Sequence, residues 1–237
     1  MTPLAHTALA SGMMIAIETA LIVWAARGDT PYRLRGLTVI NMLLIALFAR
    51  ALLDTGAGIS NITNICFASI VCCQCIVLAK HGIHAQRATI LMVNYSMTCM
   101  FALTYAVSQF PVVPGNEAFM RAMSEVCRWT YEIAAASFVA FFASQEALWR
   151  CWHGYKSRFG AVLSMLLASW ACQAVDTPVF FTIAFLWREP TAWIIEAAAT
   201  GFMVKCGLAV AFVPAFVLAT SQPVARLNGN GSVSTQM

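Results

Sequence analysis

Two oppositely charged residues lie deep inside long apolar runs of the sequence. Asp176 stands within the run 159–186, and Lys205 stands within the run 192–220. On insertion scales an ionised group at the centre of a membrane helix costs about 2.5–3.5 kcal/mol, so such residues usually have a function or neutralise one another. Two interpretations are open: a structural ion pair that joins the last two helices, or a polar substrate site in which Asp176, Lys205 or both contact the ligand.

The residues around Asp176 could add further hydrogen-bonding groups. Gln173 precedes Asp176 by three positions and therefore shares its helix face, and Thr177 follows it directly. Pro178 interrupts the helical hydrogen bonds and leaves the carbonyl of Ala174 without its usual partner. Membrane proteins build mid-membrane binding sites from a carboxylate beside a locally broken helix, although a simple kink is an equal alternative.

Three further residues are candidates for contacts with a ligand. Glu132 lies about one turn inside the outer end of the run 127–148, and Gln145 lies near the inner end of the same run. Both positions are also compatible with side chains that reach the membrane interface. Trp170 stands six residues before Asp176, far from either span end, and its indole ring could stack on a flat ligand.

No motif of a nucleotide-hydrolysing or other hydrolytic enzyme occurs in the sequence. It has no G-x-x-x-x-G-K-[ST] loop, no H-E-x-x-H and no G-x-S-x-G. Cys72, Cys73 and Cys75 could ligate a soft metal, but intramembrane cysteines more often act as small apolar residues. We therefore expect no enzymatic activity, no bound metal and no cofactor.

The composition of the chain indicates whether its helices lie in water or in a lipid bilayer. Of the 237 residues, 60% are hydrophobic and only 10% are charged, and the mean hydropathy is +0.75. A soluble domain carries about 25% charged residues. The chain is therefore expected to be an integral membrane protein. This expectation excludes a disordered chain, a disulfide-rich secreted module and nucleic-acid binding as the main function.

Several apolar runs are long enough to cross the membrane as helices of about 20 residues. The sequence predicts an all-α, polytopic membrane helix bundle that forms a single domain over residues 1–221, followed by a disordered cytoplasmic tail at 222–237. The seven predicted spans are approximately 9–26, 36–53, 60–79, 88–110, 127–148, 159–186 and 192–220.

The distribution of Lys and Arg predicts the orientation, because cytoplasmic loops are enriched in these residues. With the N-terminus outside, the cytoplasmic loops and tail contain Arg27, Arg33, Arg35, Lys80, Arg87, Arg150, Lys156, Arg158 and Arg226, and the opposite loops contain Arg121 and Arg188. We therefore expect a multi-pass protein of the cell (inner) membrane with its N-terminus outside and its C-terminus in the cytoplasm.

Seven helices with a lysine midway along the last one are also typical of a retinal-binding photoreceptor or ion pump. In that family an acid lies one helical turn before the lysine, where this sequence has Gly201. The third helix should supply an Arg and an Asp, but its segment Cys72-Cys-Gln-Cys75 has no charge. A retinal protein that uses Lys205 is therefore the alternative prediction.

The second half of the chain resembles the queuosine precursor transporter family, also called vitamin-uptake-transporter-like proteins. The resemblance extends from Ala136 to Leu218 and rests on Ala136-Ser-Phe-Val-Ala140 through Ser144-Gln145, Val175-Asp-Thr177 continuing to Phe185, Trp187-Arg-Glu-Pro190, and Val204-Lys205 continuing to Val213-Pro214. It implies an inner-membrane carrier of 7-cyano- or 7-aminomethyl-7-deazaguanine. It also implies a core of six helices similar to the substrate-binding components of energy-coupling importers, with residues 9–26 as an added helix.

The resemblance implies a nucleobase-like substrate in contact with this chain, with the lipid bilayer as its other partner; energising subunits and a homo-oligomer both remain open. A deazaguanine presents an N–H and an amino group side by side, and a carboxylate such as Asp176 can accept both. Gln173, Gln145 and Lys205 are donors for the carbonyl and cyano edges, and Trp170 or Phe180 could stack on the bicycle. Two acids of the family are missing here: one is expected shortly before the turn at His81-Gly82, where Gln74-Cys75 and Leu78-Ala79 stand, and the one expected after Ser144-Gln145 is replaced by Leu148.

Overall fold

The protein is described by a computed structural model that covers residues 3–48, 52–54, 59–61, 63–109, 115 and 117–221. The predicted tail at 222–237 therefore lies outside the described residues. The described helices are α1 (Pro3–Ala26), α2 (Tyr32–Phe48), α3 (Thr63–Ser108), α4 (Glu117–Phe185), α5 (Thr191–Ala211) and α6 (Val213–Thr220). The predicted helical architecture is confirmed, with one small exception between α2 and α3.

The exception is a pair of three-residue strands, β1 (Leu52–Asp54) and β2 (Ile59–Asn61), which are antiparallel. Leu52 opposes Asn61 and Asp54 opposes Ile59. The spans predicted at 36–53 and 60–79 thus overrun the helices slightly: α2 ends at Phe48 and α3 begins at Thr63. Hydropathy could not locate the end of α2, because Leu52 and Leu53 of β1 are as apolar as the residues of that helix.

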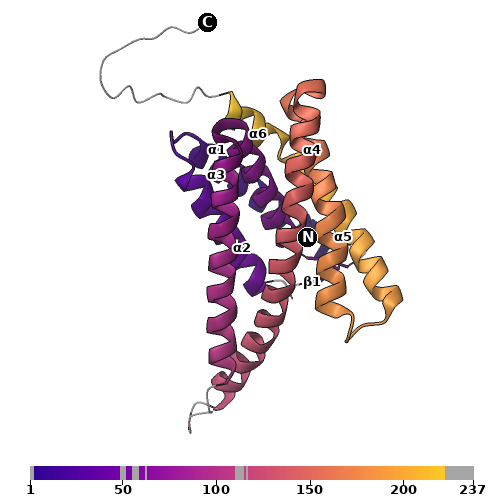
Figure 1. The fold of residues 1–237 in the computed structure, drawn as a ribbon. Helices are drawn as coiled ribbons and strands as arrows, with labels where there is room; N and C mark the ends of the chain where they lie inside the picture. Colours follow the sequence, from indigo (N-terminus) through magenta and orange to yellow (C-terminus); the bar gives the residue numbers. More distant parts are fainter. Residues whose placement is uncertain are drawn as a thin grey trace, which may run out of the picture.

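Two glycines interrupt the long helices α3 and α4. Gly82 has φ 79° and ψ −176°, and Gly160 has φ 75° and ψ 176°, a backbone conformation that is open essentially to glycine alone. We call 63–81 and 83–108 the first and second arms of α3, and 117–159 and 161–185 the first and second arms of α4. Figure 1 shows α4 rising from the lower end of the bundle and its second arm, in orange, returning beside the first.

The described helices are suited to a membrane. Four helical segments are long and apolar enough to cross a bilayer: Ala8–Ala26, Thr63–Val107, Ala135–Phe185 and Thr191–Thr220. At 1.5 Å per residue, the 46 residues of α3 and the 69 residues of α4 would greatly exceed the roughly 30 Å of a hydrocarbon core if they were straight. The protein is therefore a multi-pass membrane protein in which these helices fold back at their glycines.

The first arm of α3 forms the centre of the bundle. All its residues from 63 to 78 are buried, while each surrounding helix buries one stripe. Large buried side chains from the other helices pack around it, among them Phe141, Leu148, Phe212 and Phe216. By contrast, α1 leaves Leu9, Met13 and Ile17 more than half exposed, as expected for side chains that face lipid rather than water.

Lys80 joins three helices at the end of this first arm. Its ammonium group donates hydrogen bonds to the carbonyl oxygens of Ala26 at 2.7 Å and Ala219 at 3.4 Å. These carbonyls belong to the last turns of α1 and α6, where the helical hydrogen-bond pattern leaves acceptors free and the helix dipole favours a cation. Lys80 therefore fixes the ends of α1 and α6 to α3.

Candidate functional site

Asp176 and Lys205 meet in the interior of the bundle. The Lys205 Nζ lies 2.8 Å from the Asp176 Oδ2 and 3.4 Å from the Thr177 Oγ1, so it can donate to both oxygens. Only 2% of Asp176 and 5% of Lys205 are exposed. The same ammonium group lies 4.3 Å from the centroid of the Phe67 ring, a cation–π distance. A carboxylate, a hydroxyl and an aromatic face thus surround one buried cation.

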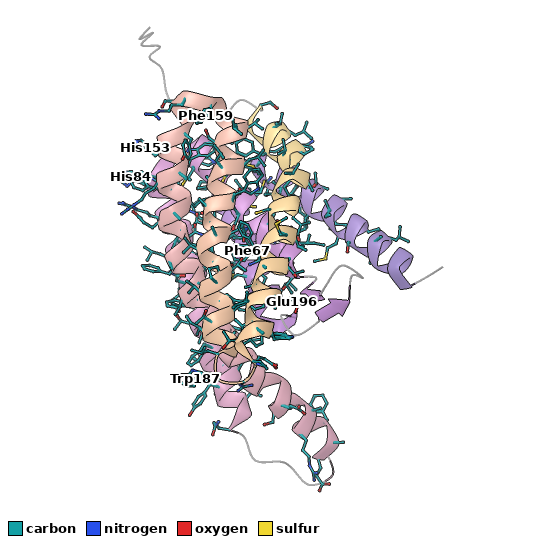
Figure 2. The ribbon with its side chains drawn as sticks, turned by 90° about the vertical axis from the view of Figure 1, so that its right-hand side faces the viewer. Phe67, His84, His153, Phe159, Trp187 and Glu196 are labelled. Atoms are coloured by element: carbon teal, nitrogen blue, oxygen red, sulfur yellow. The ribbon has the colours of Figure 1, made fainter. Side chains whose placement is uncertain are left out.

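This group of residues lies about midway along the bundle. Figure 2 shows Phe67 between Phe159 and Trp187, which lie near the two ends of the second arm of α4. Because Lys205 is in contact with Phe67, the ion pair lies at the same depth. The mid-membrane position of Asp176 and Lys205 stays a prediction.

A glycine allows the two helices that carry the pair to approach closely. Gly201 lies one turn before Lys205 on α5, and a Cβ atom added there would be 3.3 Å from the ring of Phe181 and 3.9 Å from the methyl group of Thr177. Both neighbours belong to the second arm of α4. The close packing at Gly201 lets the Lys205 side chain reach Asp176 without leaving the interface between the helices.

Several buried amide groups face the interior without a hydrogen-bond partner in the described part of the protein. Among them are both polar atoms of Gln74 and of Gln145, and the Oε1 of Gln173. The three residues are 0%, 4% and 1% exposed. An unsatisfied buried polar group costs about 1–3 kcal/mol, and such groups are rare in folded proteins. Gln74, Gln145 and Gln173 therefore have polar atoms that are available to a polar ligand.

Helical periodicity places these amides on the faces that surround the pair. Gln173 precedes Asp176 by three residues on the second arm of α4, and Gln74 follows Phe67 by seven residues on α3, so each shares a face with a residue of the site. Gln145 belongs to the buried stripe of the first arm of α4, next to Ser144, which lies beside Cys172. Cys172 is one turn before Asp176. The stripe with Gln145 therefore faces the arm that carries Asp176.

Of the predicted site residues, Trp170 lies away from this group, and Glu132 cannot be placed in it or outside it. Trp170 is 38% exposed, and its Nε1 donates to the carbonyl oxygen of Cys206 at 3.3 Å, which holds the indole ring across the outer surfaces of α4 and α5. The side chain of Glu132 lies outside the described residues. Phe67 takes the position at the pair that Trp170 was expected to take, and nothing in the sequence distinguished it from the other phenylalanines.

A second polar cluster, for which the sequence suggested no role, lies around Glu18. Its Oε2 accepts hydrogen bonds from the Ser69 hydroxyl at 2.7 Å and from the Asn41 Nδ2 at 3.0 Å. Glu18 is 5% exposed, and Asn41 is 1% exposed. The cluster connects α1, α2 and α3. In the sequence, Glu18 stands in the first apolar run and Asn41 in the second, and these two residues were the signals from which the cluster could have been predicted.

Comparison with protein families identifies the group to which these features belong. The model of the family described as "Putative vitamin uptake transporter" matches residues 61–219, about two thirds of the chain. Phe67, Asp176 and Lys205 lie inside the matched region, whereas Glu18 and Asn41 lie outside it. Searches of curated proteins and of solved structures gave no match. The resemblance seen in the second half of the sequence is confirmed, and the chain belongs to this vitamin uptake transporter family.

Proposed function

We propose that the protein is an uptake carrier for a 7-deazaguanine queuosine precursor or a related small planar base, and that Asp176 binds the edge of the base. The observation that carries the proposal is the buried Asp176–Lys205 pair at mid-bundle, with unsatisfied amides on the surrounding faces. Membership of a transporter family supports movement of a solute rather than catalysis. An apolar interior with a few convergent polar groups suits a neutral, flat ligand.

The chemistry of the ligand fits the groups available. The N–H and amino groups of a deazaguanine form a two-donor edge, which a carboxylate accepts with both oxygens. In the structure one of these oxygens, the Asp176 Oδ2, binds Lys205. Binding of the base would exchange this contact, and Lys205 could then donate to the carbonyl group of the ligand. Gln173, Gln145 and Gln74 supply further amide donors, and the ring of Phe67 offers a flat apolar surface beside Lys205.

The proposal includes the topology of the carrier. With the reversals at Gly82 and Gly160, the chain would cross the membrane seven times, and α2 to α6 would form a six-helix core similar to the binding components of energy-coupling importers, with α1 added. His84, His153 and Phe159 lie toward the same end of the bundle in Figure 2. Arg150, Lys156 and Arg158 lie in the same stretch of α4 as His153 and Phe159. We place this end of the bundle in the cytoplasm.

A retinal protein is the second candidate, because Lys205 has a carboxylate 2.8 Å away that could serve as a counter-ion. The family match favours the carrier. The two candidates are separated by adding retinal to the purified protein: a carrier stays colourless, whereas a retinal protein develops a visible absorbance band.

Uptake in cells tests the carrier directly. Cells that cannot synthesise 7-cyano-7-deazaguanine should accumulate the labelled compound when they express this protein and should fail to do so without it. Asp176→Asn should abolish the gain, whereas Glu196→Gln, which changes an exposed acid of α5, should preserve it. Equal uptake with and without the protein at confirmed membrane expression would overturn the proposed substrate.

A further inference from the structure

Glu18 differs from Asp176 in having no cationic partner among the described residues. Its carboxylate is 5% exposed and accepts only neutral donors, the Ser69 hydroxyl and the Asn41 amide. No described Lys, Arg or His forms an ion pair with it. A single negative charge in an apolar bundle is costly, and the cost is removed when a proton binds. Among the described residues, the negative charge of Glu18 therefore has no compensating cation.

The groups that face Glu18 are neutral. On α3, Cys66, Ser69 and Cys73 lie on the side toward Glu18, and the two thiols are the titratable groups among them. On α2, Thr38 donates to the carbonyl oxygen of Leu34, and Asn41 contacts the carboxylate directly. The protonation of Glu18 is therefore the event that changes the charge of this cluster.

Asn41 can satisfy Glu18 in either protonation state. Its Nδ2 donates to the Glu18 Oε2, while its Oδ1 is buried and makes no hydrogen bond in the described structure. A carboxamide has donors on one side and an acceptor on the other. When Glu18 is ionised, the amino group donates to it as observed. When Glu18 is protonated, half a turn of the amide would bring the Oδ1 into position to accept the O–H of the acid.

The first arm of α3 connects this cluster to the ion pair. Ser69 binds Glu18, and Phe67, two residues earlier, lies against Lys205. Residues two apart on a helix point to nearly opposite sides. A movement of this arm therefore changes the contacts of Glu18 and Lys205 together, and a coupling between two sites acts equally in both directions.

We infer that Glu18 is a proton-binding site, formed with Asn41 and Ser69, through which proton entry is coupled to substrate movement in this carrier. The coupling rests on the proposed function, whereas the proton site itself does not. Glu18 and Asn41 lie outside the region that matches the family, whereas Ser69 lies inside it.

The proton site is tested without any substrate, by labelling the purified protein with dicyclohexylcarbodiimide. This apolar reagent reacts with protonated, buried carboxyl groups: the acid O–H adds across one C=N bond, the proton goes to nitrogen and no group leaves. Mass spectrometry should find the adduct on Glu18. Glu18→Gln should lose it, and Glu146→Gln, which changes an exposed acid paired with Arg150, should keep it.

The outcomes of labelling separate the possible ligands of Glu18. No adduct on Glu18, in protein that is otherwise folded, would overturn the proton site. An adduct that sodium suppresses at constant pH would also overturn it and would assign the cluster to an alkali cation instead. Neither result would affect the proposed substrate, which depends on Asp176.

The coupling is tested in proteoliposomes loaded with a pH-sensitive dye. An inward proton gradient should accelerate uptake of 7-cyano-7-deazaguanine by the wild-type protein about tenfold, and substrate should drive proton entry. Glu18→Gln should lose both effects but still exchange labelled for unlabelled substrate, and Glu146→Gln should behave as the wild type. Proton-stimulated uptake by a folded Glu18→Gln protein would overturn the coupling.

Discussion

Burying the charge of Asp176 or of Lys205 alone would cost free energy, and the ion pair between them offsets this cost. Each charge is buried, and each is acceptable because the other lies 2.8 Å away. Replacing a buried pair with neutral groups can cost little, whereas removing one partner leaves an uncompensated charge and typically costs about 3–5 kcal/mol. The stability of single and double variants therefore reports whether the pair holds in the protein.

Lys205→Met alone is expected to destabilise the protein more than Lys205→Met combined with Asp176→Asn. The reason is that the single variant leaves the Asp176 carboxylate buried without its cation. Thermal unfolding in detergent, followed with a tryptophan or scattering signal, measures the difference, and Glu196→Gln serves as the exposed control. A double variant no more stable than Lys205→Met would show that the two residues do not neutralise each other.

At this scale the sequence revealed the charged residues but not their neighbours. Asp176 and Lys205 were identifiable because a charge in an apolar run is rare. Their contact depends on the register between α4 and α5 and on the close approach at Gly201, which no local pattern specifies. The burial of Gln74 depends on the central position of the first arm of α3. The exposure of Trp170 depends on which side of α4 meets α5.

At the scale of elements, two glycines allow long helices to reverse. Gly160 has φ 75°, and a Cβ added there would meet nothing within 4 Å. A substitution at Gly160 therefore acts through the backbone alone. Gly154 lies in the same helix six residues earlier, has no positive φ and is equally free of neighbours, so it provides a matched control.

Gly160→Ala is expected to destabilise the protein by about 1–3 kcal/mol, because an L-residue is strained in this conformation. Gly154→Ala should instead be neutral or stabilise by up to about 1 kcal/mol, since alanine is favoured over glycine inside a helix. Both are measured by thermal unfolding of the purified variants. Equal effects of the two substitutions would mean that the chain does not reverse at Gly160.

The sequence located the elements well where apolarity ends at a charged turn. The break at Gly82 falls in the predicted separator Lys80-His-Gly82, where two polar side chains and a glycine interrupt the apolar run. α4 begins at Glu117, ten residues before the predicted span at 127–148, because a helix can extend beyond the stretch that crosses the membrane. The division between α5 and α6 at Phe212 was also missed, although Pro214 lacks the donor needed to continue the helix.

At the scale of the whole molecule, composition was sufficient to predict a membrane protein. A chain with 10% charged residues leaves many apolar side chains exposed, among them Tyr95 at 72% and Met203 at 70%. In water such a surface would favour association, whereas in a bilayer it faces lipid. The orientation in the membrane is set by loop charge, which the fold alone does not report.

We use a reporter protein that becomes fluorescent only in the cytoplasm. Fused to the C-terminus of this protein, it is expected to fluoresce. The basis is the excess of Lys and Arg in the loops that we place inside the cell. Fluorescence of the fusion, normalised to its amount in the membrane by immunoblot, gives the measurement. The matched test is an N-terminal fusion, which should stay dark. A dark C-terminal fusion in well-expressed protein would contradict the orientation or the number of spans.

The central claim, that Asp176 binds the two-donor edge of the base, is tested most directly by the affinity of purified protein for labelled 7-cyano-7-deazaguanine. Asp176→Asn removes a charge-assisted hydrogen bond and brings an amino donor against the donors of the ligand. The binding free energy should therefore weaken by about 2–4 kcal/mol, which lowers the affinity roughly 30- to 1,000-fold. The double variant with Lys205→Met guards against a folding defect, and Glu196→Gln should bind normally. Guanine should compete and adenine should not. Wild-type affinity in folded Asp176→Asn protein would contradict the claim.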